Sequence, residues 1–141
     1  MPLGSAELVA LTGMMGAGKS TVAATLGRLL RRPVVSTDAL VVARAGKPIA
    51  EIFRDDGEAA FRALERAAVA SLRGPVVADL GGGAFCDPES AAHLLRAGRV
   101  VFLDVSAAEA ARRIGADASR PLAAEWEGRL AARRPFYARA H

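Results

Sequence analysis

Hydrophobic residues gather in four short, uninterrupted runs along this chain of 141 residues. Apolar residues in these runs follow one another instead of alternating with polar ones. That pattern is typical of strands that are covered on both faces, as in a parallel sheet. We therefore predict buried parallel strands over Leu8–Thr12, Pro33–Ser36, Val76–Leu80 and Val100–Val105.

Segments with helical spacing of apolar residues separate these runs. Glu58–Leu72 shows the spacing clearly and is followed by Gly74 and Pro75, which stop a helix. The alternation of strand and helix predicts one domain over residues 1–141, with a three-layer α/β/α fold around a central parallel sheet. The predicted helices are Thr21–Leu30, Asp38–Ala45, Ile49–Arg54, Glu58–Leu72, Pro88–Ala97, Ala107–Ile114 and Ala123–Ala140, the last interrupted near Pro135.

Composition and charge narrow the class of protein. The chain is 52% hydrophobic, and its 19 basic and 15 acidic residues are interspersed, so we expect neither a membrane span nor a dedicated nucleic-acid role. The single cysteine, Cys86, excludes an internal disulfide and a cysteine-based zinc site. The first residues lack the features of a secretion signal. We expect a monomer in the cytoplasm.

A phosphate-binding loop follows the first predicted strand. Residues 13–21 read GMMGAGKST and match the pattern G-x-x-x-x-G-K-[ST] between a strand and a helix. Backbone N–H groups of such a loop point at phosphate oxygens, the lysine reaches the β- and γ-phosphates, and the first hydroxyl holds Mg²⁺. The pattern predicts ATP and Mg²⁺ as cofactors. The candidate nucleotide-binding residues are Gly13, Met14, Gly16, Ala17, Gly18, Lys19, Ser20 and Thr21.

Candidate acceptor-binding residues lie after the second and third predicted strands, at the sheet edge where ligands of α/β folds bind. Asp38 could bind or deprotonate a substrate hydroxyl, or it could be a helix cap. Gly81, Gly82 and Gly83 could bring bare backbone against a ligand, or they could form a plain loop. The arginines Arg62, Arg120 and Arg133 could clamp an anion or carry solvated charge, and Glu58 and Glu65 are within reach of Arg62.

Taken together, these stretches resemble the shikimate kinase family. The resemblance runs in order over nearly the whole chain, and its middle block is more specific than the phosphate loop, which many NTPases share. The matching stretches are Gly13–Thr21, Thr37-Asp38, residues 46–53 (GKPIAEIF), Gly57-Glu58, Phe61-Arg62, Leu64-Glu65, residues 81–84 (GGGA), residues 101–104 (VFLD), residues 120–122 (RPL), and Arg133 with Pro135 and Tyr137.

The resemblance implies transfer of phosphate from ATP to the 3-hydroxyl of shikimate, a step of aromatic amino-acid (chorismate) biosynthesis. It places Asp38 on the shikimate hydroxyls and the pair Arg62 and Arg133 on the shikimate carboxylate. Gly82 and Gly83, with Gly81 before them, would line that pocket. Arg120 would lie in a lid over residues 115–133 and neutralise the transferring phosphoryl group beside Lys19. Arg113 would lie near the adenine.

The chain departs from the family pattern at the metal side of the site. The family usually carries an acid that assists Mg²⁺ where this chain has Ser36, and a small neutral residue where this chain has Asp79. A serine hydroxyl is a weaker partner than a carboxylate for a hard cation. Asp79 could therefore form the metal side of the site together with Ser20, or it could accept local hydrogen bonds near the loop.

Two further departures concern the end of the chain. Twelve residues, 121–132, separate Arg120 from Arg133, which predicts a short lid. The last strand and helix that usually close such a domain are absent from the sequence. Two alternatives therefore stay open beside shikimate phosphorylation. One is a related kinase of another hydroxy acid such as gluconate, and the other is a degenerate nucleotide- or metabolite-binding module without turnover.

Overall fold

The computed structural model describes residues 7–14, 18–104 and 123–140. Its sheet is parallel, with the strand order β2-β3-β1-β4. The strands are β1 (Leu8–Thr12), β2 (Val34–Ser36), β3 (Val77–Asp79) and β4 (Gly98–Phe102). The helices are α1 (Lys19–Leu30), α2 (Thr37–Ala45), α3 (Ile49–Asp56), α4 (Glu58–Ala70), α5 (Pro88–Ala97) and α7 (Ala123–Tyr137), with a 3₁₀ turn, η1 (Ala84–Cys86).

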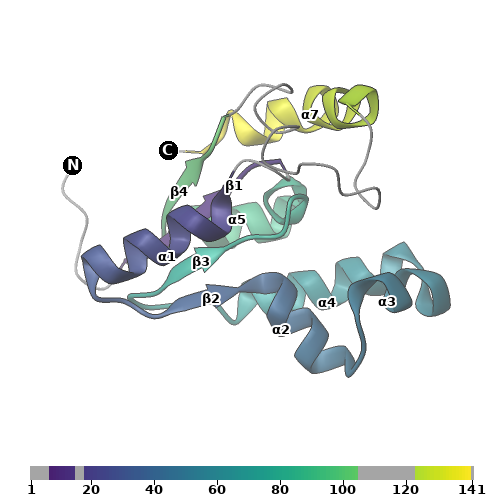
Figure 1. The fold of residues 1–141 in the computed structure, drawn as a ribbon, viewed down its shortest axis with the longest axis horizontal. Helices are drawn as coiled ribbons and strands as arrows, with labels where there is room; N and C mark the ends of the chain where they lie inside the picture. Colours follow the sequence, from purple (N-terminus) through teal and green to yellow (C-terminus); the bar gives the residue numbers. More distant parts are fainter. Residues whose placement is uncertain (1–6, 15–17, 105–122, 141) are drawn as a thin grey trace.

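Helices cover both faces of the sheet, which confirms the predicted three-layer α/β fold. Figure 1 shows α1 in front of the strands and α5 behind them, while α2, α3 and α4 form a group beside the end of β2. The end of α7 lies beside the end of β4, where Tyr137 stacks on Phe102 with ring centroids 4.6 Å apart. This arrangement leaves the carboxyl ends of the strands facing the region between α1, α2 and α7.

Three apolar clusters hold these layers together. The largest joins both central strands to α4, α5 and the end of α7, and its fully buried side chains include Leu8, Phe85 and Tyr137. A second cluster, around Ile52 and Phe61, packs the α2–α3–α4 group on itself. A third joins α1 to the front face of the sheet. Apolar burial is the main stabilising term in folding, so these clusters hold the helices in place against the sheet and against one another.

All four predicted strands and six of the seven predicted helices are present in the described residues. β4 begins two residues earlier than predicted, directly at Gly98, so α5 and β4 are joined without a loop. The predicted interruption near Pro135 is wrong, because α7 continues through this proline to Tyr137. Pro135 lies in the last turn, where the loss of one backbone hydrogen bond matters least. The helix predicted over Ala107–Ile114 lies outside the described residues.

Candidate active site

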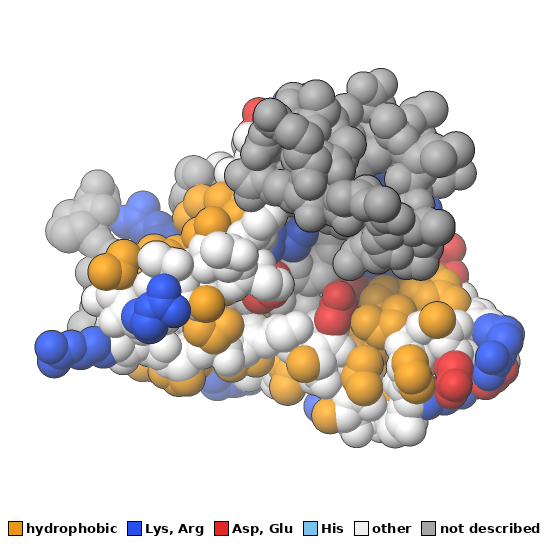
Figure 2. Space-filling model, in the orientation of Figure 1, with side chains coloured by type: hydrophobic (Ala, Val, Ile, Leu, Met, Phe, Trp, Pro, Cys, Tyr) orange, Lys and Arg blue, Asp and Glu red, His pale blue; other side chains and the backbone are white. Residues whose placement is uncertain are grey.

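The candidate site is built at the carboxyl ends of β1, β2 and β3. Ser36 ends β2 and Asp79 ends β3, and the two residues are direct partners in the parallel register. On the other side of β3, Asp79 is paired with Leu11 of β1. The phosphate loop follows β1, so it starts beside Asp79. Figure 2 shows acidic and basic side chains next to one another around a hollow near the middle of this face.

The described part of the phosphate loop is folded around Lys19. Gly18 precedes α1 with a φ of 87°, a left-handed conformation that glycine adopts without strain. The Lys19 ammonium donates hydrogen bonds to the carbonyl oxygens of Gly13 (2.8 Å) and Met14 (3.1 Å). Burial lowers the pKa of Lys19, although the nearby carboxylates of Asp79 and Asp38 oppose this shift. In the described residues, the Lys19 ammonium is therefore held at the loop by two carbonyl oxygens, with two carboxylates near enough to act on its charge.

Ser20 and Asp79 meet at the start of α1. The Ser20 hydroxyl donates a hydrogen bond to Oδ2 of Asp79 over 2.8 Å, although 59 residues separate them in sequence. The contact exists because β1 and β3 are neighbours, so the end of β3 lies beside the loop that leaves β1. Two oxygen atoms of the kind that Mg²⁺ prefers thus lie together where the bound phosphates are expected.

Asp38 is free of the capping role that it could have had. The Ser36 hydroxyl caps α2 instead, accepting a hydrogen bond from the backbone N–H of Ala39 at 3.2 Å. Thr37 is fully buried, and its hydroxyl accepts the N–H of Gly81 at 2.8 Å, which ties the end of β2 to the glycine triplet. Burial, and next the charge of Asp79, raise the pKa of Asp38, while Lys19 and Arg62 oppose the shift. Asp38 therefore presents its carboxylate to the site.

The glycine triplet, Gly81–Gly83, brings the charged side chains together, because each glycine lies against one of them. A Cβ atom at Gly81 would lie 2.6 Å from Oδ1 of Asp38, and one at Gly82 would lie 2.9 Å from Nη1 of Arg133. At Gly83 the added atom would lie 2.8 Å from Nη1 of Arg62. Real Cβ atoms are essentially never found this close to other heavy atoms. A side chain at any of the three positions would have to displace the charged end of Asp38, Arg133 or Arg62, so the triplet leaves room for these three groups to lie against the backbone.

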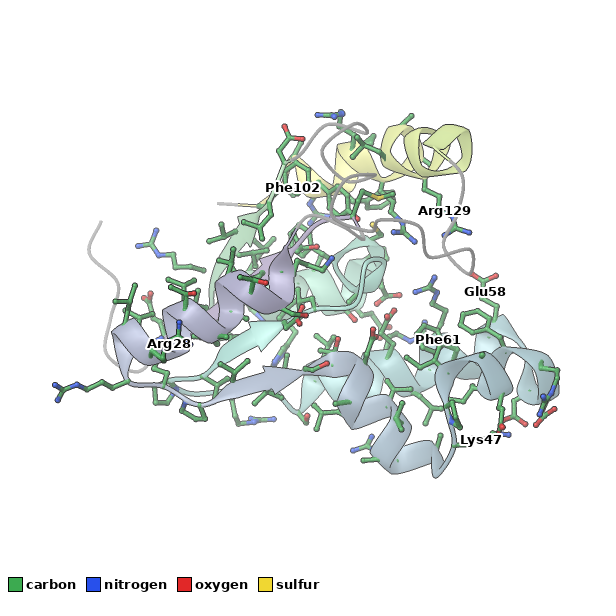
Figure 3. The ribbon with its side chains drawn as sticks, viewed as in Figure 1. Arg28, Lys47, Glu58, Phe61, Phe102 and Arg129 are labelled. Carbon is green, nitrogen blue, oxygen red and sulfur yellow. The ribbon has the colours of Figure 1, made fainter. Side chains whose placement is uncertain are left out.

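Arg62 is fixed by two neighbours on α4. Its Nη1 donates to Oε1 of Glu65 at 2.8 Å, and its guanidinium lies 5.2 Å from the ring centroid of Phe61. The Glu65 side chain is only 3% exposed, whereas Glu58, 3.6 Å from Arg62 on the other side, is 69% exposed. Figure 3 shows Phe61 pointing from α4 toward α3, where it packs on Phe53. Burial raises the pKa of Glu65, and the hydrogen bond from Arg62 opposes this shift.

Arg133 is placed by the last turns of α7. Tyr137, one turn further on, donates its hydroxyl to the carbonyl oxygen of Gly82 at 2.7 Å, and burial raises its pKa to about 12. Figure 3 shows Phe102 between β4 and α7, where it stacks on the Tyr137 ring. Both Arg133 and Tyr137 also approach Sδ of Met14, at 3.7 Å. The end of α7 is thereby tied to the triplet and to the phosphate loop at once.

The structure brings most of the residues predicted from the sequence to one place. Three residues that carried no predicted role also position the site: Thr37, Glu65 and Tyr137. The sequence offered a signal for two of them. Thr37 is a polar residue directly after a predicted strand, and Glu65 lies one helical turn from Arg62. Gly16, Ala17, Arg113 and Arg120 lie outside the described residues, and the predicted lid, residues 115–133, is described only from Ala123, where α7 begins.

In residues 7–14, 18–104 and 123–140, no group of three or more histidine, cysteine, aspartate or glutamate side chains is placed to hold a metal ion. No helix in the same part of the chain is long and apolar enough to cross a membrane. Any Mg²⁺ at this site would therefore depend on few protein oxygens and on the phosphates of a bound nucleotide.

Comparison with known proteins assigns the chain to a family. A family model described as shikimate kinase matches residues 15–141. A shikimate kinase of Thermobifida fusca is 47% identical over 123 residues, covering 85% of this chain and 70% of that protein. A shikimate kinase of Streptomyces coelicolor is 45% identical over 140 residues, covering 94% of this chain and 81% of that protein.

Solved structures agree with the sequence comparison. The structure of a shikimate kinase from Acinetobacter baumannii in complex with shikimate superimposes with a TM-score of 0.89 at 32% identity, covering 96% of this chain and 80% of that one. A gluconokinase from Sinorhizobium meliloti, at 20% identity and a TM-score of 0.54, shares the fold alone. The matching fold, the phosphate loop and the convergent acceptor residues lead to one conclusion: this chain belongs to the shikimate kinase family.

Proposed function

We propose that this protein transfers the γ-phosphoryl group of ATP to the 3-hydroxyl of shikimate, giving shikimate 3-phosphate and ADP. One observation supports the proposal: one carboxylate and two guanidinium groups lie against the three consecutive glycines, and we take the space around them, beside the phosphate loop, as the acceptor pocket. A Cβ at Gly82 would lie 2.9 Å from Arg133 and 3.8 Å from the Gly13 carbonyl, so pocket and loop adjoin. An acceptor bound in the pocket lies beside the phosphate donor.

The acceptor pocket suits a small molecule that carries both a carboxylate and hydroxyl groups. The planar guanidinium groups of Arg62 and Arg133 match a carboxylate in two-point contacts. The Asp38 carboxylate accepts hydrogen bonds from hydroxyl groups and orients the one that attacks. The backbone of Gly82 and Gly83 lines the wall between them. This division of roles favours shikimate over gluconate, in agreement with the family to which the chain belongs.

On the donor side, the chain's residues bind and neutralise the phosphates. The loop around Lys19 surrounds the phosphates with N–H groups, and the lysine spreads the charge that develops during transfer. The transferred group leaves the bridging oxygen of ADP and bonds to the acceptor oxygen, whose proton is released. Because such transfer depends mainly on positioning and charge, the site needs no covalent intermediate.

The residues present fit a magnesium ion. The Ser20 hydroxyl and the Asp79 carboxylate are hard oxygen ligands, and they lie 2.8 Å apart at the start of α1. When bound, Mg²⁺ would neutralise negative charge on the phosphates of the nucleotide. We propose Ser20 and Asp79 as the residues that hold it.

The remaining roles belong to residues outside the described part of the chain. We propose that Arg120 approaches the transferring phosphoryl group from a lid over residues 115–133 that excludes water, and that Arg113 lies near the adenine. The lid matters because water in the open site would hydrolyse ATP. We further propose a monomer that acts in the cytoplasm and binds neither nucleic acid nor membranes.

A coupled assay of ADP release tests this function. The protein is supplied with ATP and Mg²⁺, with and without shikimate, and the product mass is measured. Shikimate-dependent ADP release with formation of shikimate 3-phosphate is the expected result. Gluconate, tested in the same assay, should release no ADP. Saturable binding of shikimate or nucleotide by calorimetry with no product would contradict the proposal and favour a binding module without turnover.

A further inference from the structure

We propose that the metal-side carboxylate of this enzyme has moved from β2 to β3: Asp79 does here what the acid at the position of Ser36 does in the family pattern. The inference rests on the ATP- and Mg²⁺-dependent part of the proposed function. It does not depend on which acceptor is phosphorylated. Three observations support it, concerning the register of the sheet, the contact with Ser20 and the state of Ser36.

The register of the sheet makes the two positions equivalent. Ser36 and Asp79 are Cα partners at the carboxyl ends of adjacent parallel strands. Side chains of paired residues in a parallel sheet project on the same side, so both positions lie on one side of the sheet at its carboxyl edge. A carboxylate lost from one strand end can therefore be replaced from the neighbouring one without any change in the backbone.

The contact with Ser20 shows where the Asp79 carboxylate lies. Its Oδ2 accepts the Ser20 hydroxyl at 2.8 Å, and Ser20 is the loop hydroxyl to which the phosphate-loop pattern assigns the metal. β3 thus supplies its only charged side chain to the loop rather than to the sheet surface.

The hydrogen bond made by Ser36 shows that its hydroxyl does not take the place of a metal-side carboxylate. Its hydroxyl accepts the N–H of Ala39 and caps α2, so it serves the helix. It also carries no charge, and hard divalent cations favour carboxylate oxygens. Of the two paired positions, only Asp79 offers a charge to a metal ion.

A different account would make Asp79 a local hydrogen-bond acceptor that positions the Ser20 hydroxyl and has no role with metal. The two accounts differ in one respect. A metal-side carboxylate changes how strongly Mg²⁺ promotes nucleotide binding, and it can be supplied from position 36. Loss of a local acceptor could weaken the first property by misplacing Ser20, but a carboxylate at position 36 would not restore it.

The test exchanges the two residues and measures nucleotide binding rather than turnover. The variants are Asp79→Ser, Ser36→Asp and the double exchange Ser36→Asp/Asp79→Ser. Calorimetry gives the ADP affinity over a series of Mg²⁺ concentrations and in EDTA, with no shikimate present. We expect Asp79→Ser to raise the Mg²⁺ concentration for half-maximal promotion of ADP binding by about 10- to 100-fold, the range seen when metal-supporting residues are lost.

The double exchange should return that Mg²⁺ requirement close to the starting value, and ADP affinity in EDTA provides the metal-free reference for each variant. Unchanged Mg²⁺ dependence in Asp79→Ser overturns the proposal. A loss in Asp79→Ser that the double exchange fails to restore also overturns it, because the positions are then not equivalent. Thermal unfolding in EDTA identifies a variant that fails to fold, and Asp79→Asn, which keeps the shape, then takes the place of Asp79→Ser.

The outcome is independent of the acceptor. A protein that binds MgADP but phosphorylates no shikimate would contradict the proposed function and leave this test intact. Conversely, if the protein phosphorylates shikimate but its Mg²⁺ dependence is the same in all variants, the proposed function stands and the metal role of Asp79 is contradicted.

Discussion

The donor and acceptor halves of the site are held in opposite ways. On the donor side, Lys19 donates to the carbonyl oxygens of its own loop, at Gly13 and Met14. On the acceptor side, the charged groups are fixed by partners on other residues, Arg62 by buried Glu65 and the Arg133 helix by the bond from Tyr137 to Gly82. A nucleotide must therefore draw Lys19 away from the loop carbonyls, whereas an acceptor meets guanidinium groups that are already in place.

This difference predicts that nucleotide binding and acceptor binding require different amounts of side-chain reorganisation. Reorganising a charged donor consumes part of the interaction with phosphate, while a pocket whose side chains are fixed loses little entropy when the acceptor binds. We therefore expect changes on the donor side to appear mainly in turnover. Changes on the acceptor side should appear mainly in the Michaelis constant for shikimate.

Replacing Lys19 should have the largest effect. We expect Lys19→Ala to lower kcat on the order of 10²- to 10³-fold, because the variant loses a donor aimed at developing charge. Shikimate affinity, measured by calorimetry without nucleotide, should be largely retained. Lys47→Ala is the matched control, since Lys47 is bound to Asp56 at 2.7 Å on the surface near α3. A parallel loss of shikimate affinity in Lys19→Ala would show that the two halves are not independent.

Arg133 tests the acceptor half with a change that keeps its charge. We expect Arg133→Lys to raise the Michaelis constant for shikimate by about 10- to 100-fold, since a lysine cannot make the two-point contact with a carboxylate. Affinity for ADP should not change. Arg134→Lys is the control, because the neighbouring Arg134 is 55% exposed and 3.9 Å from Asp104 at the surface. Equal effects of the two substitutions would show that Arg133 does not bind the shikimate carboxylate.

Sequence reasoning reached the donor half more completely than the acceptor half, for a physical reason. Residues 13–21 are consecutive, so their spacing alone predicts how they surround phosphate. The four strands and the central parallel sheet were predictable as well, because apolar runs report burial directly. The exact ends were not: β4 starts at Gly98 and α7 passes through Pro135, both because packing outweighs local propensity.

The acceptor half depends on contacts between distant residues, which spacing does not encode. Asp38 was a candidate through its place after the second predicted strand, and Arg62 and Arg133 were candidates as possible anion clamps. Only the resemblance to a family assigned them to one substrate. Sequence could not show that each of the three glycines lies against a different charged side chain, nor that Tyr137 donates to Gly82. The same holds for Ser36 and Asp79, whose equivalence follows from the register of two strands.

The two glutamates beside Arg62 sharpen the comparison within the acceptor half. We expect Glu65→Gln to raise the Michaelis constant for shikimate about tenfold, because the bond that fixes Arg62 loses its charge. Glu58→Gln, which alters an exposed partner of the same arginine, should change it little. Steady-state kinetics on the two variants gives the result. If both substitutions act equally, burial of Glu65 is not what fixes Arg62.

The smallest effect concerns an electrostatic link between the halves, from Asp79 on the donor side to Asp38 on the acceptor side. Burial, and next the charge of Asp79, raise the pKa of Asp38, so this carboxylate becomes protonated at a higher pH than an ordinary aspartate. Since Asp38 accepts hydroxyl groups of the acceptor only while it is ionised, shikimate affinity should fall as the pH falls through this raised pKa. Asp79→Asn removes the second cause, lowers the pKa of Asp38 and should move the loss of affinity to lower pH.

Calorimetry of shikimate binding across a pH series, without nucleotide or Mg²⁺, measures this shift apart from any effect on the metal. Titration of shikimate itself is common to both proteins, so only their difference counts. Asp55→Asn is the control, because Asp55 forms its ion pair with Arg54 at the surface of α3. A pH profile that stays in place in Asp79→Asn would mean that Asp79 acts on the donor half alone. A shift would mean that the charge at the end of β3 tunes both halves of the site.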